Sequence, residues 1–151
     1  MIIGIDPGAS LKVESTGYAT FSEEGDLVDF GQILAEDLPG LLKTIQPTVI
    51  VCENYRNLPW KPKAQNWSDN KASKVIGMCE MWCAINPPCK LELQDAPAKN
   101  MGIMWSGVKV PKDHSVSHQV MAYAHGVYYL VRNGIRTVLS YHQNKEKVPG
   151  Q

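Results

Sequence analysis

The sequence predicts an α/β domain with a central mixed five-stranded sheet and helices on both faces, and three observations support this prediction. An apolar run from Met1 ends at Asp6, and a β-branched run from Thr48 ends at Glu53. Strand-like and helix-like segments alternate between and after these runs. The 151 residues are enough for one domain with a real core, and we expect a flexible tail from about residue 141.

The first strand delivers the carboxylate of Asp6 to an edge of the sheet, where an α/β protein would hold a metal ligand. Pro7 and Gly8 follow it and allow the backbone to turn sharply and to approach a ligand closely. The alternative is ordinary turn chemistry, in which Asp6 caps its own turn.

The segments 17–21 and 27–31 predict a hairpin of two further strands, because the acidic and glycine-containing turn 23–26 separates them. A short helix over 37–45 follows, and Pro47 stops it. The strand 48–52 then ends at Glu53, after which Asn54 begins a loop. A second acid at the end of a second buried strand strengthens the functional interpretation of Asp6.

The second half of the chain predicts three helices and one strand. A helix over 70–84 is capped by Ser68 or Asp69, and a strand over 90–93 follows the break at 86–88. A short helix over 96–104, a mobile loop over 105–112 and a long helix over 115–133 complete the chain. This order predicts a mixed sheet with helices on its faces.

Composition limits the classes of function. The chain has 15 basic and 15 acidic residues, so any site for a polyanion must be a local patch. No apolar stretch approaches the ~20 residues of a membrane span, and the amino terminus has no leader-like segment, so we expect a cytoplasmic protein without a membrane partner. The four cysteines form no paired CxxC motifs and predict reduced core thiols rather than a zinc site.

Three groups of residues together resemble one family, and the likeness spans nearly the whole chain. They are 4–8 with 16–19 shortly after, Glu53 at the end of the fourth strand, and 118–130 in the last helix. They resemble the RuvC-type Holliday junction resolvases, especially their small phage relatives. The opening segment is also similar to that of the actin-type ATPases, but this chain is too short for their two lobes.

The resemblance implies a ribonuclease H-like fold, a homodimer, and Mg²⁺- or Mn²⁺-dependent cleavage of a four-way DNA junction in a bacterial cell or a phage-infected host. Asp6 and Glu53 would hold the metal, because hard cations prefer oxygen ligands, and we expect their carboxylates within about 6 Å of each other. Lys99 occupies a place where the resolvases carry a lysine near the scissile phosphate.

The last helix departs from the family pattern at one position. The resolvases present two metal ligands there, one helical turn apart, and the match places His118 first and Met121 second. We expect His118 to bind metal or transfer a proton, the alternative being a hydrogen-bonded histidine under the sheet edge. The thioether of Met121 is soft where a hard carboxylate oxygen is wanted, which predicts weaker metal binding.

Two further residues lie near the position of the missing acid. Asp113 could restore the missing ligand, or it could simply cap the last helix and favour its dipole. His125 lies two turns inside the helix, and we expect it to pack against the core.

Binding of DNA is expected from basic residues and tryptophans around the site. They supply charge for phosphates and flat surfaces for unstacked bases. Alternatively, the tryptophans anchor a proline-braced loop to the core. The residues assigned to this role are Arg56, Trp60, Lys61, Lys63, Trp67, Lys71, Lys74, Lys109 and Lys112. A helical set of large apolar residues is expected in the core, with a dimer face as the alternative: Met78, Met81, Trp82 and Ile85.

The sequence therefore predicts a metal-dependent endonuclease that resolves four-way or other branched DNA. Because of Met121, the alternative is a protein that binds junctions and cuts them weakly or not at all. A second alternative is a ribonuclease H-fold nuclease that acts on flap DNA or structured RNA.

Overall fold

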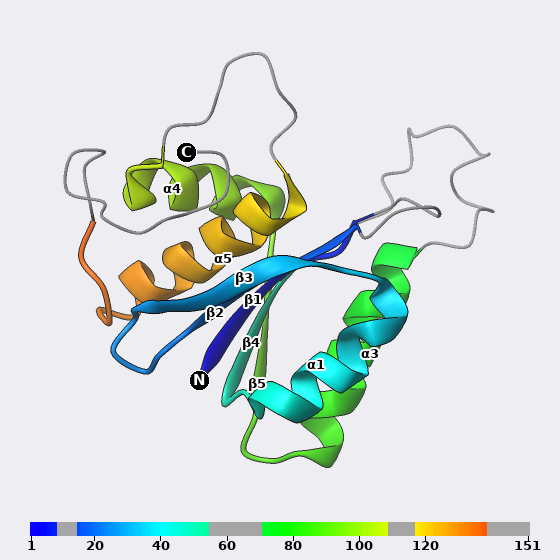
Figure 1. Ribbon diagram of the computed structural model, residues 1–151. Coiled ribbons are helices and arrows are strands. Elements are labelled where there is room, and N and C mark those ends of the chain that lie inside the picture. The colour runs from blue at the N-terminus through cyan, green and yellow to red at the C-terminus, as the bar shows by residue number, and fades with distance from the viewer. Residues whose placement is uncertain (9–14, 55–70, 109–116, 139–151) are drawn as a thin grey trace.

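The computed structural model describes residues 1–8, 15–54, 71–108 and 117–138. The strands are β1 (Ile2–Asp6), β2 (Thr16–Phe21), β3 (Leu27–Ile33), β4 (Val49–Glu53) and β5 (Lys90–Gln94). The helices are η1 (Ala35–Asp37), α1 (Leu38–Ile45), α3 (Lys71–Ile85), α4 (Ala96–Ser106) and α5 (His118–Arg132). Figure 1 shows α1 and α3 on one face of the sheet and α4 and α5 on the other, as predicted.

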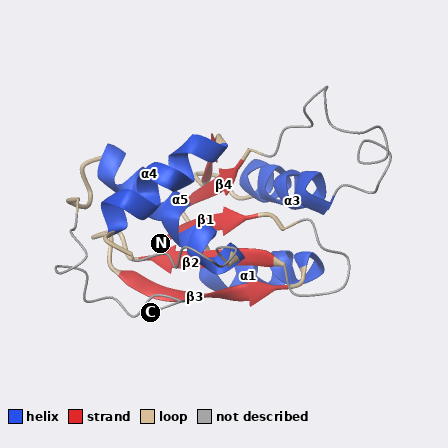
Figure 2. Cartoon of the chain, turned by 90° about the horizontal axis from the view of Figure 1, so that it is seen from above, coloured by secondary structure: helices blue, strands red, loops and turns tan. Residues whose placement is uncertain are grey.

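The five strands form one mixed sheet in the order β3-β2-β1-β4-β5, part of which can be followed in Figure 2. β1, β2 and β3 pair antiparallel, whereas β4 pairs parallel with both β1 and β5. Because β1, β4 and β5 run in the same direction, their carboxyl ends meet at one edge. This edge brings Asp6, Glu53 and Gln94 onto neighbouring strands.

Alternation along the central strands decides which side chains face which helical layer. Ile3 packs in the core cluster beneath α1 and α3, whereas Ile2 packs in the cluster beneath α5. Asp6 is in phase with Ile2, and Glu53 is in phase with Val51, which belongs to the same α5-side cluster. Both carboxylates therefore face the helical layer of α5.

Two glycines let α5 lie directly on the backbone of the sheet. A Cβ atom on Gly4 would lie 2.2 Å from the carbonyl oxygen of Ala122, and one on Gly17 would lie 2.0 Å from that of His118. No side chain fits at either position while the helix stays where it is. The start of α5 is therefore held close to the end of β1, where Asp6 lies.

The predicted elements are confirmed, with different ends. The helix predicted over 96–104 continues to Ser106, so Trp105 is helical and was wrongly assigned to a loop. Its ring stacks on Tyr128 of α5 with centroids 5.3 Å apart, which favours the extra turn. Gly107 then ends the helix in a left-handed conformation. The rest of the predicted loop, 109–112, and the predicted tail lie outside the described residues.

The four cysteines are all free thiols. Cys52 and Cys79 are buried in the core cluster beneath α1 and α3, as predicted, and Cys83 and Cys89 are half-buried and pack against the same cluster. Their sulfur atoms lie 3.4 Å apart, because Cys83 on α3 faces the segment that leads into β5.

The apolar set on α3 divides into two groups. Met78 and Trp82 pack against the core, as expected, whereas Met81 and Ile85 are 61% and 70% exposed. The core assignment was therefore wrong for the latter pair, because they lie on the side of α3 that faces away from the sheet. None of the helices among the described residues is long and apolar enough to cross a membrane.

The contact between β1 and α5 generates the first prediction. Replacing Gly4 by Ala should lower the free energy of unfolding by about 3 kcal/mol, because the added methyl group meets backbone that cannot move aside. Replacing Gly77 in α3 by Ala provides the control, since nothing lies within 4 Å of its Cβ position. That change should stabilise the protein by up to ~1 kcal/mol through helix propensity. Chemical denaturation measures both, and equal stability of the two variants would contradict the packing described.

Candidate active site

Asp6 and Glu53 form the centre of the site. β1 and β4 are parallel and in register up to Ile5 and Cys52, so the next residues of the two strands lie side by side. Asp6 is 4% exposed and Glu53 is half-buried. One carboxylate oxygen of each, together with a ring nitrogen of His125, lies within 4.8 Å of the others. The predicted proximity of the two carboxylates is confirmed.

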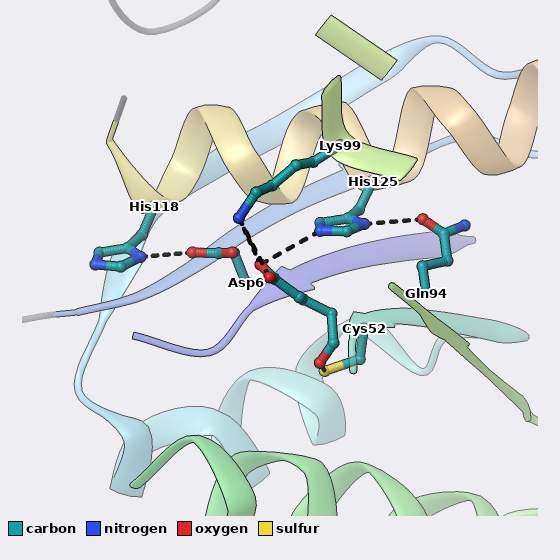
Figure 3. A network of polar contacts seen from close by, with 7 residues as sticks. Asp6, Cys52, Gln94, Lys99, His118 and His125 are labelled. Carbon is teal, nitrogen blue, oxygen red and sulfur yellow. Dashed lines mark hydrogen bonds and ion pairs between the residues drawn. The ribbon is translucent and has the colours of Figure 1, made fainter. Parts of the chain in front are cut away.

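His118 is the first residue of α5, and its ring points toward Asp6 (Figure 3). Its Nδ1 atom is hydrogen-bonded to Oδ2 of Asp6 at 2.5 Å, and its side chain remains 40% exposed. The close approach of α5 to Gly17 produces this contact, since it places the helix start beside the end of β1. The structure thus brings His118 to the carboxylates, and its chemical role stays a prediction.

Lys99 reaches the site from α4. Its Nζ atom donates to both carboxylate oxygens of Glu53, each at 3.2 Å. Its side chain is 22% exposed and that of Glu53 is 15% exposed, so the pair is shielded from bulk water. Lys99 therefore supplies the positive charge that balances Glu53.

His125 extends the site inward, which the sequence did not indicate. The side chain is fully buried, in agreement with its predicted place in the core, but it also faces the carboxylates (Figure 3). Its Nε2 atom lies 3.5 Å from Oε2 of Glu53, and its Nδ1 atom lies 2.9 Å from Oε1 of Gln94. His118 and His125 are two helical turns apart, so both histidines lie on one side of the helix. This spacing was the sequence signal by which His125 could have been found.

Gln94 is the second residue that the sequence did not single out. It pairs with Glu53 across β4 and β5 and is 5% exposed. Its Nε2 atom donates to Oε1 of Glu92 at 2.9 Å, and its Oε1 atom faces His125. The signal was a polar residue at the end of the third parallel strand, at the edge that already held two acids.

The two carboxylates are electrostatically unequal. Burial raises the pKa of Asp6, the neighbouring Glu53 raises it further, and the hydrogen bond to His118 only partly opposes this. Burial also acts to raise the pKa of Glu53, but contacts with His125 and Asp6 and the charge of Lys99 outweigh it and hold that pKa below its usual range. The hydrogen bond to Asp6 raises the pKa of His118. A divalent cation would favour the ionised forms of both acids at once.

The donor set fits a divalent metal ion. It combines two carboxylates with an imidazole nitrogen, His125 Nε2, that is buried and has no hydrogen-bond partner in the described part of the chain. At 3.5 Å, its contact with Glu53 is too long for a good hydrogen bond. Buried polar atoms are normally satisfied, so this atom points to a missing partner between the three groups.

Met121 lies on the same side of α5 as both histidines, one turn from each, and is half-buried. The site therefore has no carboxylate at the position where the resemblance expects one. Asp113 lies outside the described residues, and so do most of the predicted DNA contacts: Arg56, Trp60, Lys61, Lys63, Trp67, Lys109 and Lys112. Lys74 is exposed on α3, on the opposite face of the sheet from α5, and Lys71 is the first residue of that helix.

Two solved structures that share the fold are those of resolvases. RuvC of T. thermophilus in complex with a Holliday junction substrate matches with a TM-score of 0.57 and 13% identity over 91% of this chain and 98% of that chain. The resolvase of Fowlpox virus, in complex with Holliday junction DNA, matches with a TM-score of 0.58 and 16% identity over 87% and 99%. No family model and no curated protein sequence matches the chain. The predicted ribonuclease H-like, RuvC-type fold is thereby confirmed.

The ion pair of Lys99 with Glu53 generates the second prediction. Replacing Lys99 by Gln should strengthen Mn²⁺ binding by roughly tenfold, because it removes a positive charge that repels the metal from Glu53. Isothermal titration calorimetry measures the change. Lys74→Gln removes an exposed lysine from the other helical layer and should leave the affinity unchanged. Weaker binding in Lys99→Gln would show that the lysine organises the site rather than competes with the metal.

Proposed function

We propose that this protein is a metal-dependent, structure-selective endonuclease that resolves four-way (Holliday) or other branched DNA junctions by phosphodiester hydrolysis. The observation that carries the proposal is the pair of Asp6, which is buried, and Glu53, which is half-buried, at one sheet edge, with His118 and Lys99 beside it. The shared fold with two resolvases that were solved with Holliday junction DNA supports the choice of substrate.

In this proposal Asp6 and Glu53 hold Mg²⁺ or Mn²⁺, with Asp113 as a further candidate ligand. When bound, such ions activate the attacking water and stabilise the leaving oxygen. His118 orients the carboxylate of Asp6 through its Nδ1 atom and has an exposed ring from which a proton can pass to water. Lys99 holds Glu53 in place and directs a positive charge toward an incoming phosphate.

DNA would be held by local charge rather than by net charge, which is zero. The basic residues and tryptophans assigned above, 56–74 and 109–112, would form this patch. A homodimer would present two sites to the two strands that must be cut at a junction. We place this activity in the cytoplasm of a bacterial or phage-infected cell, and in the phage-like branch of the resolvases.

A second candidate is a protein that binds branched DNA without cutting it. The observation that favours it is the half-buried Met121, which stands one turn from His118 where the resemblance expects an acid. A nuclease of the same fold acting on flap DNA or structured RNA is the remaining alternative. A panel of four-way, flap and RNA substrates, each followed for binding and for cleavage in Mg²⁺ and Mn²⁺, separates the three.

The third prediction concerns Asp6. Replacing it by Asn should abolish cleavage of a four-way junction while leaving junction binding intact or tighter, because a negative charge facing the phosphates is lost. Gel shift and strand-cleavage assays on the same labelled junction measure both. Loss of binding together with cleavage would make Asp6 structural. A parent protein that shifts the junction in Mg²⁺ and leaves every strand whole is the non-cutting binder.

The fourth prediction concerns Met121. Replacing it by Asp should raise junction cleavage above that of the parent, most strongly at low metal concentration, because it adds an anionic ligand beside Asp6 and Glu53. Met121→Asn provides the control, since a neutral amide of the same size adds no charge. Unfolding of the Asp variant would show that Met121 serves packing. A parent that already cuts at full rate would show that another group completes the site.

A further inference from the structure

We infer that His125 is itself a metal ligand through Nε2, and that Gln94 is the residue that positions it. This inference rests on the proposed function, because it concerns the ligand set of the same site. It adds an imidazole to the two carboxylates and thereby favours Mn²⁺ over Mg²⁺. The metal-ligand role of His125 does not follow from the position that the resemblance assigns to His118.

The tautomer of His125 is set by a chain of hydrogen bonds from β5. The ionised carboxylate of Glu92 can only accept, so the amide nitrogen of Gln94 must face it. Oε1 of Gln94 then faces Nδ1 of His125 at 2.9 Å, and this oxygen also can only accept. The proton of a neutral His125 must therefore reside on Nδ1, and Nε2 carries a lone pair.

The lone pair on Nε2 is directed at the carboxylates, and no described donor offers it a hydrogen bond. The side chain is fully buried, and Nε2 lacks a hydrogen-bond partner among the residues that the structure describes. The nearest oxygen, Oε2 of Glu53 at 3.5 Å, is also an acceptor. Two acceptors that face each other in a buried site repel unless a proton or a metal ion lies between them.

The distances suit a metal ion. The ligand atoms of Asp6, Glu53 and His125 lie within 4.8 Å of one another. Ligand atoms of one divalent ion are about 3 Å apart when adjacent and about 4.4 Å apart when opposite, so the three atoms lie near the separations that a bound ion requires. A histidine whose other nitrogen donates to a fixed acceptor is also the usual arrangement of a metal-bound imidazole. Gln94 provides that acceptor.

The choice of metal follows from the donor atoms. Carboxylates bind both Mg²⁺ and Mn²⁺, whereas an imidazole nitrogen adds more to the affinity for a transition ion than to that for Mg²⁺. A site of two carboxylates and His125 should therefore bind Mn²⁺ more tightly than Mg²⁺, and removal of the imidazole should reduce that difference.

The fifth prediction tests the ligand directly in the full-length protein. Pulsed electron paramagnetic resonance of bound Mn²⁺ should show coupling to a ¹⁴N nucleus, which labelling with ¹⁵N-histidine should replace by ¹⁵N coupling. The coupling should persist in His118→Gln and disappear in His125→Gln. Calorimetry should show Mn²⁺ affinity at least ~10-fold weaker in His125→Gln, with a smaller loss for Mg²⁺.

A matched pair at Gln94 tests the positioning and serves if His125→Gln does not fold. Gln94→Met removes the acceptor for Nδ1–H and should weaken Mn²⁺ binding by roughly 10-fold. The exchanged pair Glu92→Gln/Gln94→Glu keeps an acceptor for Nδ1–H and a donor facing it without placing two carboxylates side by side, and it should retain the affinity and the nitrogen coupling. Equal losses in both variants would reduce Gln94 to a packing role and overturn its assignment.

The outcomes also separate this inference from the proposed function. If the parent binds Mn²⁺ and its nitrogen coupling survives in His125→Gln with unchanged affinity, His125 is only a buried partner of Glu53 and the inference is wrong. If the parent takes up no divalent ion and cuts no junction, the proposed function fails as well. Cleavage by a parent that shows no nitrogen coupling overturns the inference alone.

Discussion

The site depends on one packing constraint, the direct contact between the backbone of α5 and that of β1 and β2. The missing Cβ atoms of Gly4 and Gly17 allow the helix to lie against the strands, and this contact fixes both its height above the sheet and its register. His118 consequently reaches Asp6 at the end of β1, while His125 lies over Glu53. A helix held further from the sheet by a single methyl group would separate the imidazoles from the carboxylates. The chemistry therefore depends on this close contact between helix and sheet.

The same contact buries charge that the fold must balance from its own residues. The carboxylates of Asp6 and Glu53 would repel each other strongly at this poorly hydrated site, and each is paired with a different side chain. His118 approaches Asp6 from the exposed side, and Lys99 approaches Glu53 from α4. These two groups keep the acids in place without a metal ion, but neither satisfies Nε2 of His125. Among the described residues, one buried nitrogen beside the two acids, Nε2 of His125, is therefore left without a hydrogen-bond partner.

Much of the fold and part of the site could be predicted from the sequence. The apolar runs that end at Asp6 and Glu53 were sufficient to place two carboxylates at one edge, because parallel strands bring their carboxyl ends together. The contribution of His125 was not predictable in this way, because a buried histidine in an apolar helix face looks the same whether its polar partner is a carboxylate or a backbone group. Gln94 was equally hidden, since its role depends on the order of β4 and β5 in the sheet rather than on any local motif. Helix ends such as that of α4 depended on the stacking of Trp105 on Tyr128, a contact between distant segments.

The presence of His125 changes how the lack of an acid at Met121 is interpreted. Both residues lie on the same side of α5, one turn apart, with His125 deeper in the site. If the deeper residue supplies a ligand, the outer position no longer has to be an acid for one metal ion to be held by three protein groups. The neutral imidazole also adds no further negative charge to a buried site that already contains two carboxylates, one of which has a raised pKa. A neutral inner ligand in place of an anionic outer one would therefore reduce the repulsion among the protein's own groups, and it would shift the metal preference toward ions that accept nitrogen.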